Sequence, residues 1–295
     1  MRPEITSFFD DKTNSASYVV ADPGTAHAAI IDPVLDFDPV SGRTSTASAE
    51  KVAAHVADNN LTIDWILETH VHADHLTGSA WLKQRLGGQI AIGQGVTAVQ
   101  ETFGALLNVT AGMATDGSQF DRLFADGATF EIGGPGGPGG PGGIEGRVIA
   151  TPGHTPSCVT YVIGDACFIG DTMFMPDSGT ARCDFPGGDA KRLFTSIQKI
   201  LELPDETRLF VCHDYGAGGT RDFAWETTIG DQRTNNIHVG GAMEHDYVQM
   251  RRDRDATLTL PRLIIPAVQV NMRAGEFPPA EDNGTSYIKV PLNLF

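Results

Sequence analysis

The chain has 295 residues, of which 41% are hydrophobic and 20% charged, a length that allows one large domain or two modest ones. Its 21 Lys and Arg against 37 Asp and Glu give a formal charge of −16, which excludes nucleic-acid binding through a net basic face and opposes binding to an anionic membrane. The N-terminus has no apolar run of signal-peptide type, and no stretch approaches the ~20 apolar residues that span a bilayer, so we expect a soluble cytoplasmic protein.

The N-terminal third alternates between strand-like and helix-like segments. The predicted elements are strands over 17–20, 27–32, 64–69 and 89–93 and helices over 49–60 and 77–88. Ser48 is the expected cap of the first helix, and the Gly-Gly pair after Leu86 is a stop signal for the second.

The rest of the chain continues this alternation. The predicted elements are helices over 96–108, 189–204, 225–235 and 244–257, and strands over 147–153, 158–165, 166–171 and 207–214. The strands on either side of Gly164–Asp165 should form a hairpin. An extended tail with several prolines is expected after the last helix.

One segment breaks the pattern. Residues 133–143 read GGPGGPGGPGG, and a Gly/Pro tract holds neither a helix nor a central strand, so we predict a flexible surface loop between two strands. Ile-Glu-Gly-Arg at 144–147 follows it and resembles a protease-cleavage tag, which leaves open whether this short segment is native.

Strands and helices that alternate in two successive sets indicate a layered α/β architecture. No point in the chain has the composition of a linker between independent domains. We therefore predict one αββα-like domain over 1–295, with a core of about 1–215 and a helical C-terminal extension over 216–295.

Three of the nine histidines fall within six residues, in the string His70-Val-His72-Ala-Asp74-His75. The string follows an apolar run, and the end of a strand is a common place for catalytic groups. Imidazole and carboxylate are ligands of transition metals. A metal bound by this string would need the loop to curl.

Three further groups follow predicted strands. His154 lies in Thr-Pro-Gly-His-Thr, Asp171 in Gly-Asp-Thr, and His213 in Cys-His-Asp. Taken singly, an Asp or His after a strand is usually a turn or loop residue. Together with the histidine string, they stand at the carboxyl ends of strands and can converge on one site.

In this order, these four motifs resemble the metallo-β-lactamase superfamily, which implies an αββα sandwich with the metal at one edge. The strings GTARCDFPGGDA and NMR place the resemblance closer to the persulfide dioxygenases (the ETHE1-like group), which are related to glyoxalase II. That group implies one Fe(II) per chain, held by His70, His154 and Asp171. A site with two histidines and one carboxylate leaves positions open for substrate and O2, as in Fe(II) oxygenases.

The implied reaction is the oxidation of glutathione persulfide by O2 and water to sulfite and glutathione. His72, Asp74, His75 and His213 would then surround the ligands and orient them through hydrogen bonds. The resemblance also suggests a homodimer.

A rival interpretation uses the same residues for two Zn(II) ions. His70, His72 and His154 would bind the first ion, Asp74, His75 and His213 the second, and Asp171 would bridge them. A bridging hydroxide would then hydrolyse glutathione thioesters, as in glyoxalase II. The histidine string by itself does not decide between one metal and two.

Glutathione carries two carboxylates, and arginine is their natural bidentate partner. Arg182 and Arg221 are therefore candidate substrate contacts, and Tyr215 could also reach the pocket.

Overall fold

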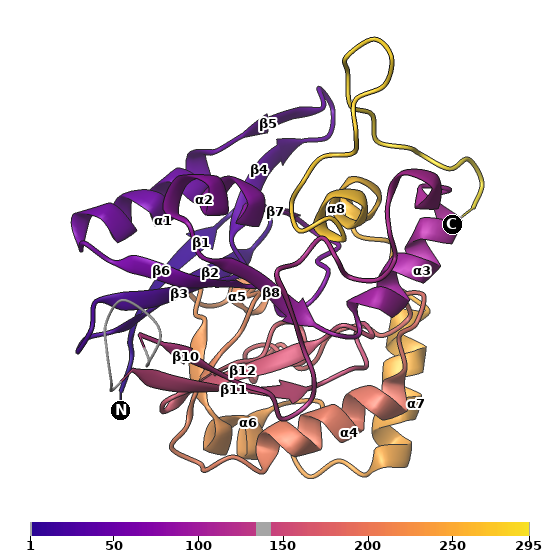
Figure 1. Ribbon diagram of the computed structural model, residues 1–295. Coiled ribbons are helices and arrows are strands. Elements are labelled where there is room, and N and C mark those ends of the chain that lie inside the picture. Colours follow the sequence, from indigo (N-terminus) through magenta and orange to yellow (C-terminus); the bar gives the residue numbers. More distant parts are fainter. Residues whose placement is uncertain (1, 134–142, 295) are drawn as a thin grey trace.

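The computed structural model describes residues 2–133 and 143–294, and its first sheet has six strands in the order β1-β2-β3-β6-β8-β9 (Figure 1). The strands are β1 (Glu4–Asp10), β2 (Ser15–Asp22), β3 (His27–Ile31), β6 (Thr62–Leu67), β8 (Gln89–Gly93) and β9 (Arg122–Phe124). Strands β1, β2 and β3 pair antiparallel, and β3, β6, β8 and β9 pair parallel. The carboxyl ends of β3 and β6 therefore lie at the same edge.

The second sheet has the order β10-β11-β12-β13-β14-β15. Its strands are β10 (Thr129–Ile132), β11 (Ile144–Ala150), β12 (Val159–Ile163), β13 (Ala166–Phe168), β14 (Arg208–Phe210) and β15 (Glu226–Thr228). Strands β12 and β13 form the predicted hairpin. A small third sheet contains β5 (Arg43–Ser45), β4 (Val34–Asp38) and β7 (Leu76–Thr77).

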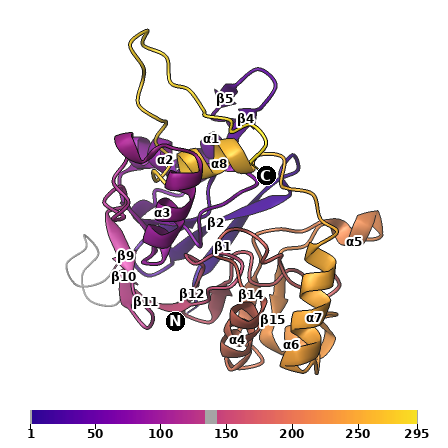
Figure 2. The same ribbon diagram turned by 90° about the vertical axis from the view of Figure 1, so that its right-hand side faces the viewer.

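Helices cover the outer faces of both sheets (Figures 1 and 2). On the first sheet lie α1 (Ala47–Asp58), α2 (Ser79–Leu86), α3 (Val96–Leu106) and α8 (Ile264–Asn271). On the second lie α4 (Ala190–Leu201), α6 (Ile229–Asn235) and α7 (Glu244–Asp255). Two short turns, η1 (Thr110–Gly112) and α5 (Gly216–Gly219), complete the elements. This arrangement confirms the predicted αββα sandwich.

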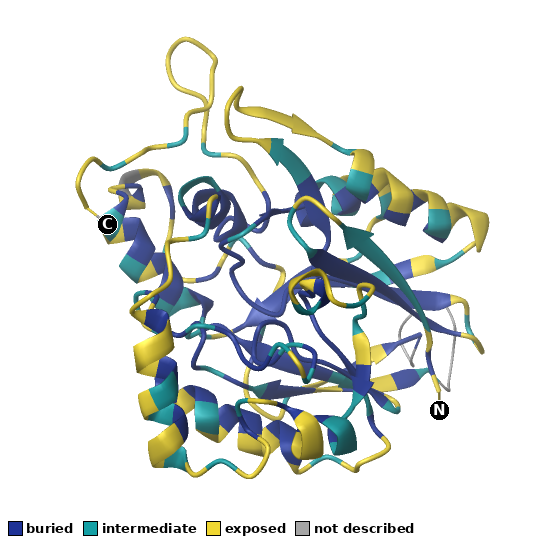
Figure 3. Cartoon of the chain, turned by 180° about the vertical axis from the view of Figure 1, so that it is seen from behind, coloured by how far each residue is buried: buried dark blue, intermediate teal, exposed yellow. Residues whose placement is uncertain are grey.

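Alternation along the strands builds the apolar layers. On β2, Tyr18 and Val20 pack between the sheets, whereas Val19 and Ala21 face α1 and its neighbours. Successive side chains of a strand point to opposite faces, so a strand covered on both faces needs apolar residues at every position. Figure 3 shows the result, with buried strands in the middle and helices that are buried on one side and exposed on the other.

Local signals at helix ends are confirmed in part. Helix α2 ends at Leu86, and Gly87 follows with φ of 78°. Helix α1 starts earlier than predicted, after Thr46, and the prediction that Ser48 caps it is wrong. The backbone N–H of Ser48 instead donates to an Asp36 carboxylate oxygen at 2.8 Å, so an acidic side chain from β4 satisfies this helix start.

The Ile-Glu-Gly-Arg segment is an integral part of the second sheet. Residues 144–147 open β11 and pair in register with Ile132 to Thr129 of β10. A Cβ on Gly146 would lie 2.2 Å from the Phe130 ring, so the aromatic ring packs directly on the glycine backbone. The predicted Gly/Pro loop falls almost wholly outside the described residues.

The C-terminal segment is interleaved with the core. Strand β15 pairs with β14, so part of the stretch predicted as a helix over 225–235 is sheet. The tail predicted as extended contains helix α8, whose third residue is Pro266. Proline is tolerated there because the first N–H groups of a helix have no intrahelical partner. Burial of Ala267 and Val268 against two apolar clusters supplies the stability that local propensity lacks.

Within residues 2–133 and 143–294, no helix combines the length and the apolar character that a membrane crossing requires.

Candidate metal centre

The histidine string forms a tight curl between the end of β6 and β7. His70, His72 and His75 are at most 1% exposed. The ring centroids of His70 and His72 are 4.1 Å apart, and those of His72 and His75 are 4.3 Å apart. The curl that the spacing requires is therefore present.

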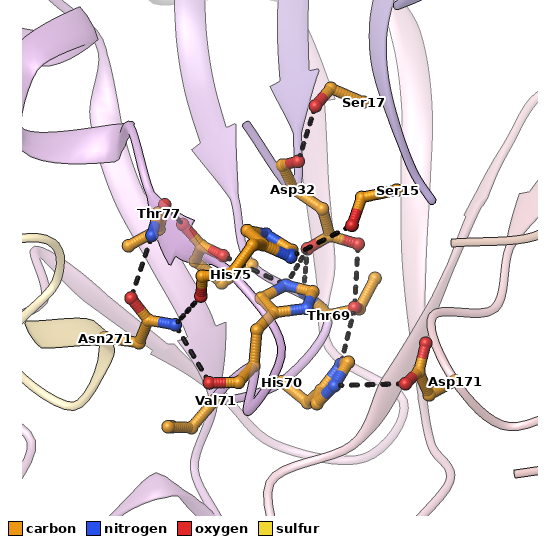
Figure 4. Close-up of polar contacts among 12 residues, drawn as sticks. Ser15, Ser17, Asp32, Thr69, His70, Val71, His75, Thr77, Asp171 and Asn271 are labelled. Carbon is orange, nitrogen blue, oxygen red and sulfur yellow. Dashed lines mark hydrogen bonds and ion pairs between the residues drawn. The ribbon is translucent and has the colours of Figure 1, made fainter. Parts of the chain in front are cut away.

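Two residues from distant segments hold this curl (Figure 4). Asp32, directly after β3, accepts the Thr69 N–H at 2.7 Å and the Thr69 hydroxyl at 2.8 Å. Asn271, at the end of α8, donates to the carbonyls of His72 at 2.9 Å and His75 at 2.7 Å, and its Oδ1 accepts the Thr77 N–H at 2.8 Å. Asp32 and Asn271 thus satisfy four backbone polar groups between residues 69 and 77.

The other predicted metal-site residues follow strands of the second sheet. His154 follows β11, Asp171 follows β13, and His213 follows β14. A Cβ on Gly153 would lie 2.3 Å from the Leu193 backbone, so only glycine lets the chain turn against α4 just before His154.

Hydrogen bonds fix which nitrogen of each of these imidazoles is free. The Nδ1 of His154 lies 2.7 Å from the carbonyl oxygen of Arg182, and the Nδ1 of His213 lies 3.1 Å from that of Asn14. A carbonyl only accepts, so each Nδ1 carries the hydrogen and each Nε2 keeps a lone pair. The Nδ1 of His70 lies 3.0 Å from the Thr69 hydroxyl, and that hydroxyl donates its hydrogen to Asp32. The Nδ1 of His70 therefore also carries a hydrogen, and its Nε2 keeps a lone pair.

These lone pairs meet in a hollow where the protein offers them no hydrogen-bond partner. Among the described residues, buried atoms without such a partner include His70 Nε2, His72 Nδ1, His75 Nε2, His213 Nε2 and Asp171 Oδ1. Leaving several buried polar atoms unsatisfied is costly, and bound cations would satisfy atoms of this kind. The donor set of imidazole nitrogen and carboxylate oxygen therefore fits a transition metal.

The ligand atoms fall into two sets. His70, His154 and Asp171 have ligand atoms within 4.8 Å of one another, and His72, Asp74, His75 and His213 form a second such set. Asp171 Oδ2 lies 3.8 Å from His70 Nε2 and 3.7 Å from His154 Nε2. The Nε2 of His72 lies 3.0 Å from Asp32 and 3.4 Å from Glu68, so Nδ1 is the nitrogen that His72 can offer to a metal.

Charge around the two sets differs. Burial, followed by the neighbouring His72 and His154, lowers the pKa of His70 well below its usual value, which keeps it neutral as a ligand must be. Burial alone would lower the pKa of His213, but the carboxylates of Asp171 and Asp74 outweigh it and raise this pKa well above its usual value. In the metal-free protein, the negative charges of Asp171 and Asp74 therefore favour the protonated, positively charged form of His213.

We expect His75→Ala to keep the metal of the first set and to lower turnover. The His75 Nδ1 lies 3.2 Å from both Ser15 Oγ and Asp74 Oδ2, and its removal leaves His70, His154 and Asp171 intact. Loss of a group that orients its neighbours typically lowers activity by roughly 10- to 100-fold. Elemental analysis and kcat measure the two effects, with His245→Ala, an exposed histidine, as control. Loss of the metal would make His75 a direct ligand.

A cavity of about 610 Å³ opens over the first set. His154, Asp171 and His213 line its inner end, and Phe174, Phe185 and Tyr215 contribute aromatic wall. A mostly apolar cleft with a few polar groups at its base is the usual form of a small-molecule site.

The predicted substrate contacts differ in their surroundings. Tyr215 and Arg182 line the cavity, whereas Arg221 is absent from its lining. The Arg182 guanidinium binds both oxygens of Asp184 at 2.7 Å. Arg221 lies between the carboxylates of Asp177 and Asp214, at 2.6 Å and 2.7 Å. Both arginines already have carboxylate partners within the chain.

His238 packs behind the cavity wall, where its Nδ1 accepts the Thr180 N–H at 2.9 Å. Burial, followed by the charges of Arg251 and Arg254, lowers the pKa of His238 to about 4. The folded chain therefore binds a proton there less readily than the unfolded chain, and the stability gained above pH ~6.5 is lost as the pH falls towards ~4.

We expect His238→Asn to flatten this acid loss of stability, because the amide oxygen can still accept the Thr180 N–H but does not titrate. The ring is half-buried and solvent screens part of the effect, so the difference between variant and wild type should change by about 1–2 kcal/mol between pH 6.5 and 4. Urea unfolding across that range measures it. Parallel pH profiles for the two proteins would contradict the expectation.

Sequence reasoning missed Asp32, Glu68 and Asn271. Asp32 carries the signal that singled out Asp171, an aspartate directly after an apolar strand. Nothing in the local sequence connects Asn271 to a loop almost 200 positions earlier.

Comparison with known proteins agrees with this geometry. A family model described as the metallo-beta-lactamase superfamily matches residues 10–213. A probable metallo-hydrolase of Burkholderia pseudomallei is 50% identical over 98% of this chain and 99% of its own, and glyoxylase B2 of Dictyostelium discoideum is 48% identical over 99% and 98%. The chain spans 65% of the length of a beta-lactamase hydrolase-like protein of Xylella fastidiosa, with 51% identity over 99% of this chain.

Two further similarities concern ETHE1 proteins. The mitochondrial persulfide dioxygenase ETHE1 of Bos taurus is 29% identical over 94% of this chain and 91% of its own. The crystal structure of ETHE1 from Myxococcus xanthus superposes with a TM-score of 0.71 and 26% identity, covering 92% of this chain and 100% of that one. Because the family model matches well over half of its length, this chain belongs to the metallo-beta-lactamase superfamily.

Proposed function

We propose that this enzyme is a persulfide dioxygenase that converts glutathione persulfide, O2 and water to glutathione and sulfite at one Fe(II) per chain. The observation that carries the proposal is the set of His70, His154 and Asp171, whose ligand atoms lie within 4.8 Å of one another. Two histidines and one carboxylate on one side of an ion leave its other positions free, the arrangement that Fe(II) oxygenases use. The similarity to the two ETHE1 proteins also supports it.

The tautomers support a site of three protein ligands. His70 and His154 each direct a bare Nε2 towards Asp171. Asp32 and Glu68 lie next to His72 Nε2, which leaves Nδ1 of His72 as its free nitrogen. A bound Fe(II) would activate O2 for transfer to the persulfide, whose outer sulfur would supply the four electrons as it is oxidised to sulfite.

The chain's own residues would position the substrate and handle protons. Phe174 and Phe185 shield the inner end of the cavity from water. His213 Nε2 lies 3.3 Å from Asp74 Oδ2 and 3.3 Å from Asp171 Oδ1. The reaction consumes one water molecule and forms sulfite, so a proton acceptor is required next to the sulfur. By sharing a proton between Nε2 and Oδ2, the pair of His213 and Asp74 can relay protons away from the sulfur.

One observation favours a second candidate, a dinuclear zinc hydrolase of glutathione thioesters. His72, Asp74, His75 and His213 form a complete second set of ligand atoms. The names of the relatives from Burkholderia pseudomallei and Dictyostelium discoideum point in the same direction. With two ions in place, a metal-bound hydroxide would attack the thioester carbonyl.

Oxygen uptake by anaerobically purified, iron-loaded protein separates the two candidates. With glutathione persulfide, we expect one O2 consumed per sulfite formed, and elemental analysis should find about one iron per chain. S-lactoylglutathione is the matched substrate for the rival. Its hydrolysis by zinc-loaded protein with two zinc per chain, together with no O2 uptake by the iron form, would replace the dioxygenase by the hydrolase.

A further inference from the structure

The cavity over the metal centre contains one arginine that lacks an acidic partner. Arg182, Arg251 and Arg254 all line it. Arg182 binds Asp184, and Arg251 binds Asp255 at 2.6 Å. Across the described part of the chain, the Arg254 side chain forms no ion pair and donates no hydrogen bond, so its charge is uncompensated.

A buried ion pair between Arg251 and Asp255 fixes helix α7, which carries Arg254. Arg251 and Asp255 are 1% and 4% exposed, and they bracket Arg254 in the last turn of α7. Arg251 also donates to the Thr180 carbonyl at 2.9 Å, and Asp255 accepts the Cys183 N–H at 2.9 Å. These bonds join α7 to the cavity wall, so the backbone of Arg254 is held in place while its side chain stays free.

The side chains around Arg254 indicate the chemical class of ligand that it would bind. Leu258, Leu260 and Ile237 line the same cavity and are partly exposed. An uncompensated guanidinium beside apolar side chains suits an organic molecule with a carboxylate and an aliphatic part. The chain as a whole carries a formal charge of −16 and therefore repels anions. An anionic substrate consequently needs a local positive group at the mouth of the cavity.

We infer that Arg254 binds a carboxylate of the substrate at the outer end of the cavity and thereby selects thiol compounds that carry carboxylates. Arg182 then helps to shape the wall, and neither Arg182 nor Arg221 is free for the substrate, since their guanidinium groups are already paired. The identity of the substrate as a glutathione derivative rests on the proposed function, whereas the role of Arg254 as a carboxylate contact can be tested without turnover.

Binding of S-methylglutathione, which cannot react, tests the role directly by titration calorimetry on the metal-loaded protein. We expect Arg254→Gln to weaken binding roughly 10- to 100-fold, the effect of losing a charge-assisted hydrogen bond. Arg254→Lys should recover part of the loss. The matched control is Arg252→Gln, which removes the same charge from the same helix but does not line this cavity. Equal affinity of the two glutamine variants, or no binding by wild type, would overturn the inference.

Turnover adds a second readout. For glutathione persulfide, Arg254→Gln should raise KM by a similar factor and leave kcat nearly unchanged, because the contact is the same in the bound substrate and in the transition state. For the persulfide of 2-mercaptoethanol, which has no carboxylate, the variant and wild type should have equal kcat/KM. An equal loss with both persulfides would overturn the inference. Intact binding of S-methylglutathione without O2 uptake by wild type would reject the proposed function alone.

Discussion

Asp171→Ala should release the metal of the first set and abolish turnover. Asp171 is the only carboxylate of that set, and its Oδ2 lies within 3.8 Å of both His70 Nε2 and His154 Nε2. Without it, two neutral imidazoles remain, and they cannot balance the charge of a divalent ion in a buried site. We expect metal content to fall from about one ion per chain to less than ~0.1, with at least a ~1000-fold loss of kcat/KM.

Elemental analysis after gel filtration measures the metal, and circular dichroism checks that the variant is folded. Asp177→Ala is the matched control, because Asp177 lines the same cavity but binds Arg221. A stoichiometric ion in Asp171→Ala would show that the ligand assignment is wrong. Metal loss from the Asp177 variant as well would show that removal of any carboxylate near the cavity suffices.

Asn271→Ala should destabilise the whole fold and weaken metal binding. The side chain is 3% exposed and makes three hydrogen bonds to the backbone of the loop that carries the histidine string. Truncation leaves the carbonyls of His72 and His75 and the N–H of Thr77 without partners. Each unsatisfied buried group costs ~1–3 kcal/mol, and we expect a total loss of about 3–5 kcal/mol in the free energy of unfolding.

Urea unfolding of the metal-free protein measures the structural part of this effect, and competition with a chelator measures the metal affinity. Asn283→Ala, an exposed asparagine in the C-terminal tail, should change the free energy of unfolding by less than ~0.5 kcal/mol. Asn271→Asp retains an acceptor for the Thr77 N–H but loses the two donors, so it should be nearly as destabilised as the alanine variant. Wild-type stability in either Asn271 variant would mean that the loop holds its curl by itself.

The layers of the fold and the residue types of the metal centre could be predicted from the amino-acid sequence. Short apolar runs predicted the strands that precede His70, Asp171 and His213, because a strand buried on both faces is apolar along most of its length. The position of these residues at strand ends then predicted their convergence, since parallel neighbours end at one edge of a sheet. Helix α8 was missed, because its stability comes from burial against two apolar clusters and not from local helix propensity.

Which polar groups are free depends on the tertiary fold. The sequence predicted Arg182 and Arg221 as substrate contacts and did not single out Arg254. Their difference arises from partners brought together by folding, such as Asp177, which lies 44 positions from Arg221. The same holds for His72, which Asp32 holds by its Nε2. Hydrogen bonds and ion pairs depend on distances of a few ångströms between distant segments, and no local pattern of residues records those distances.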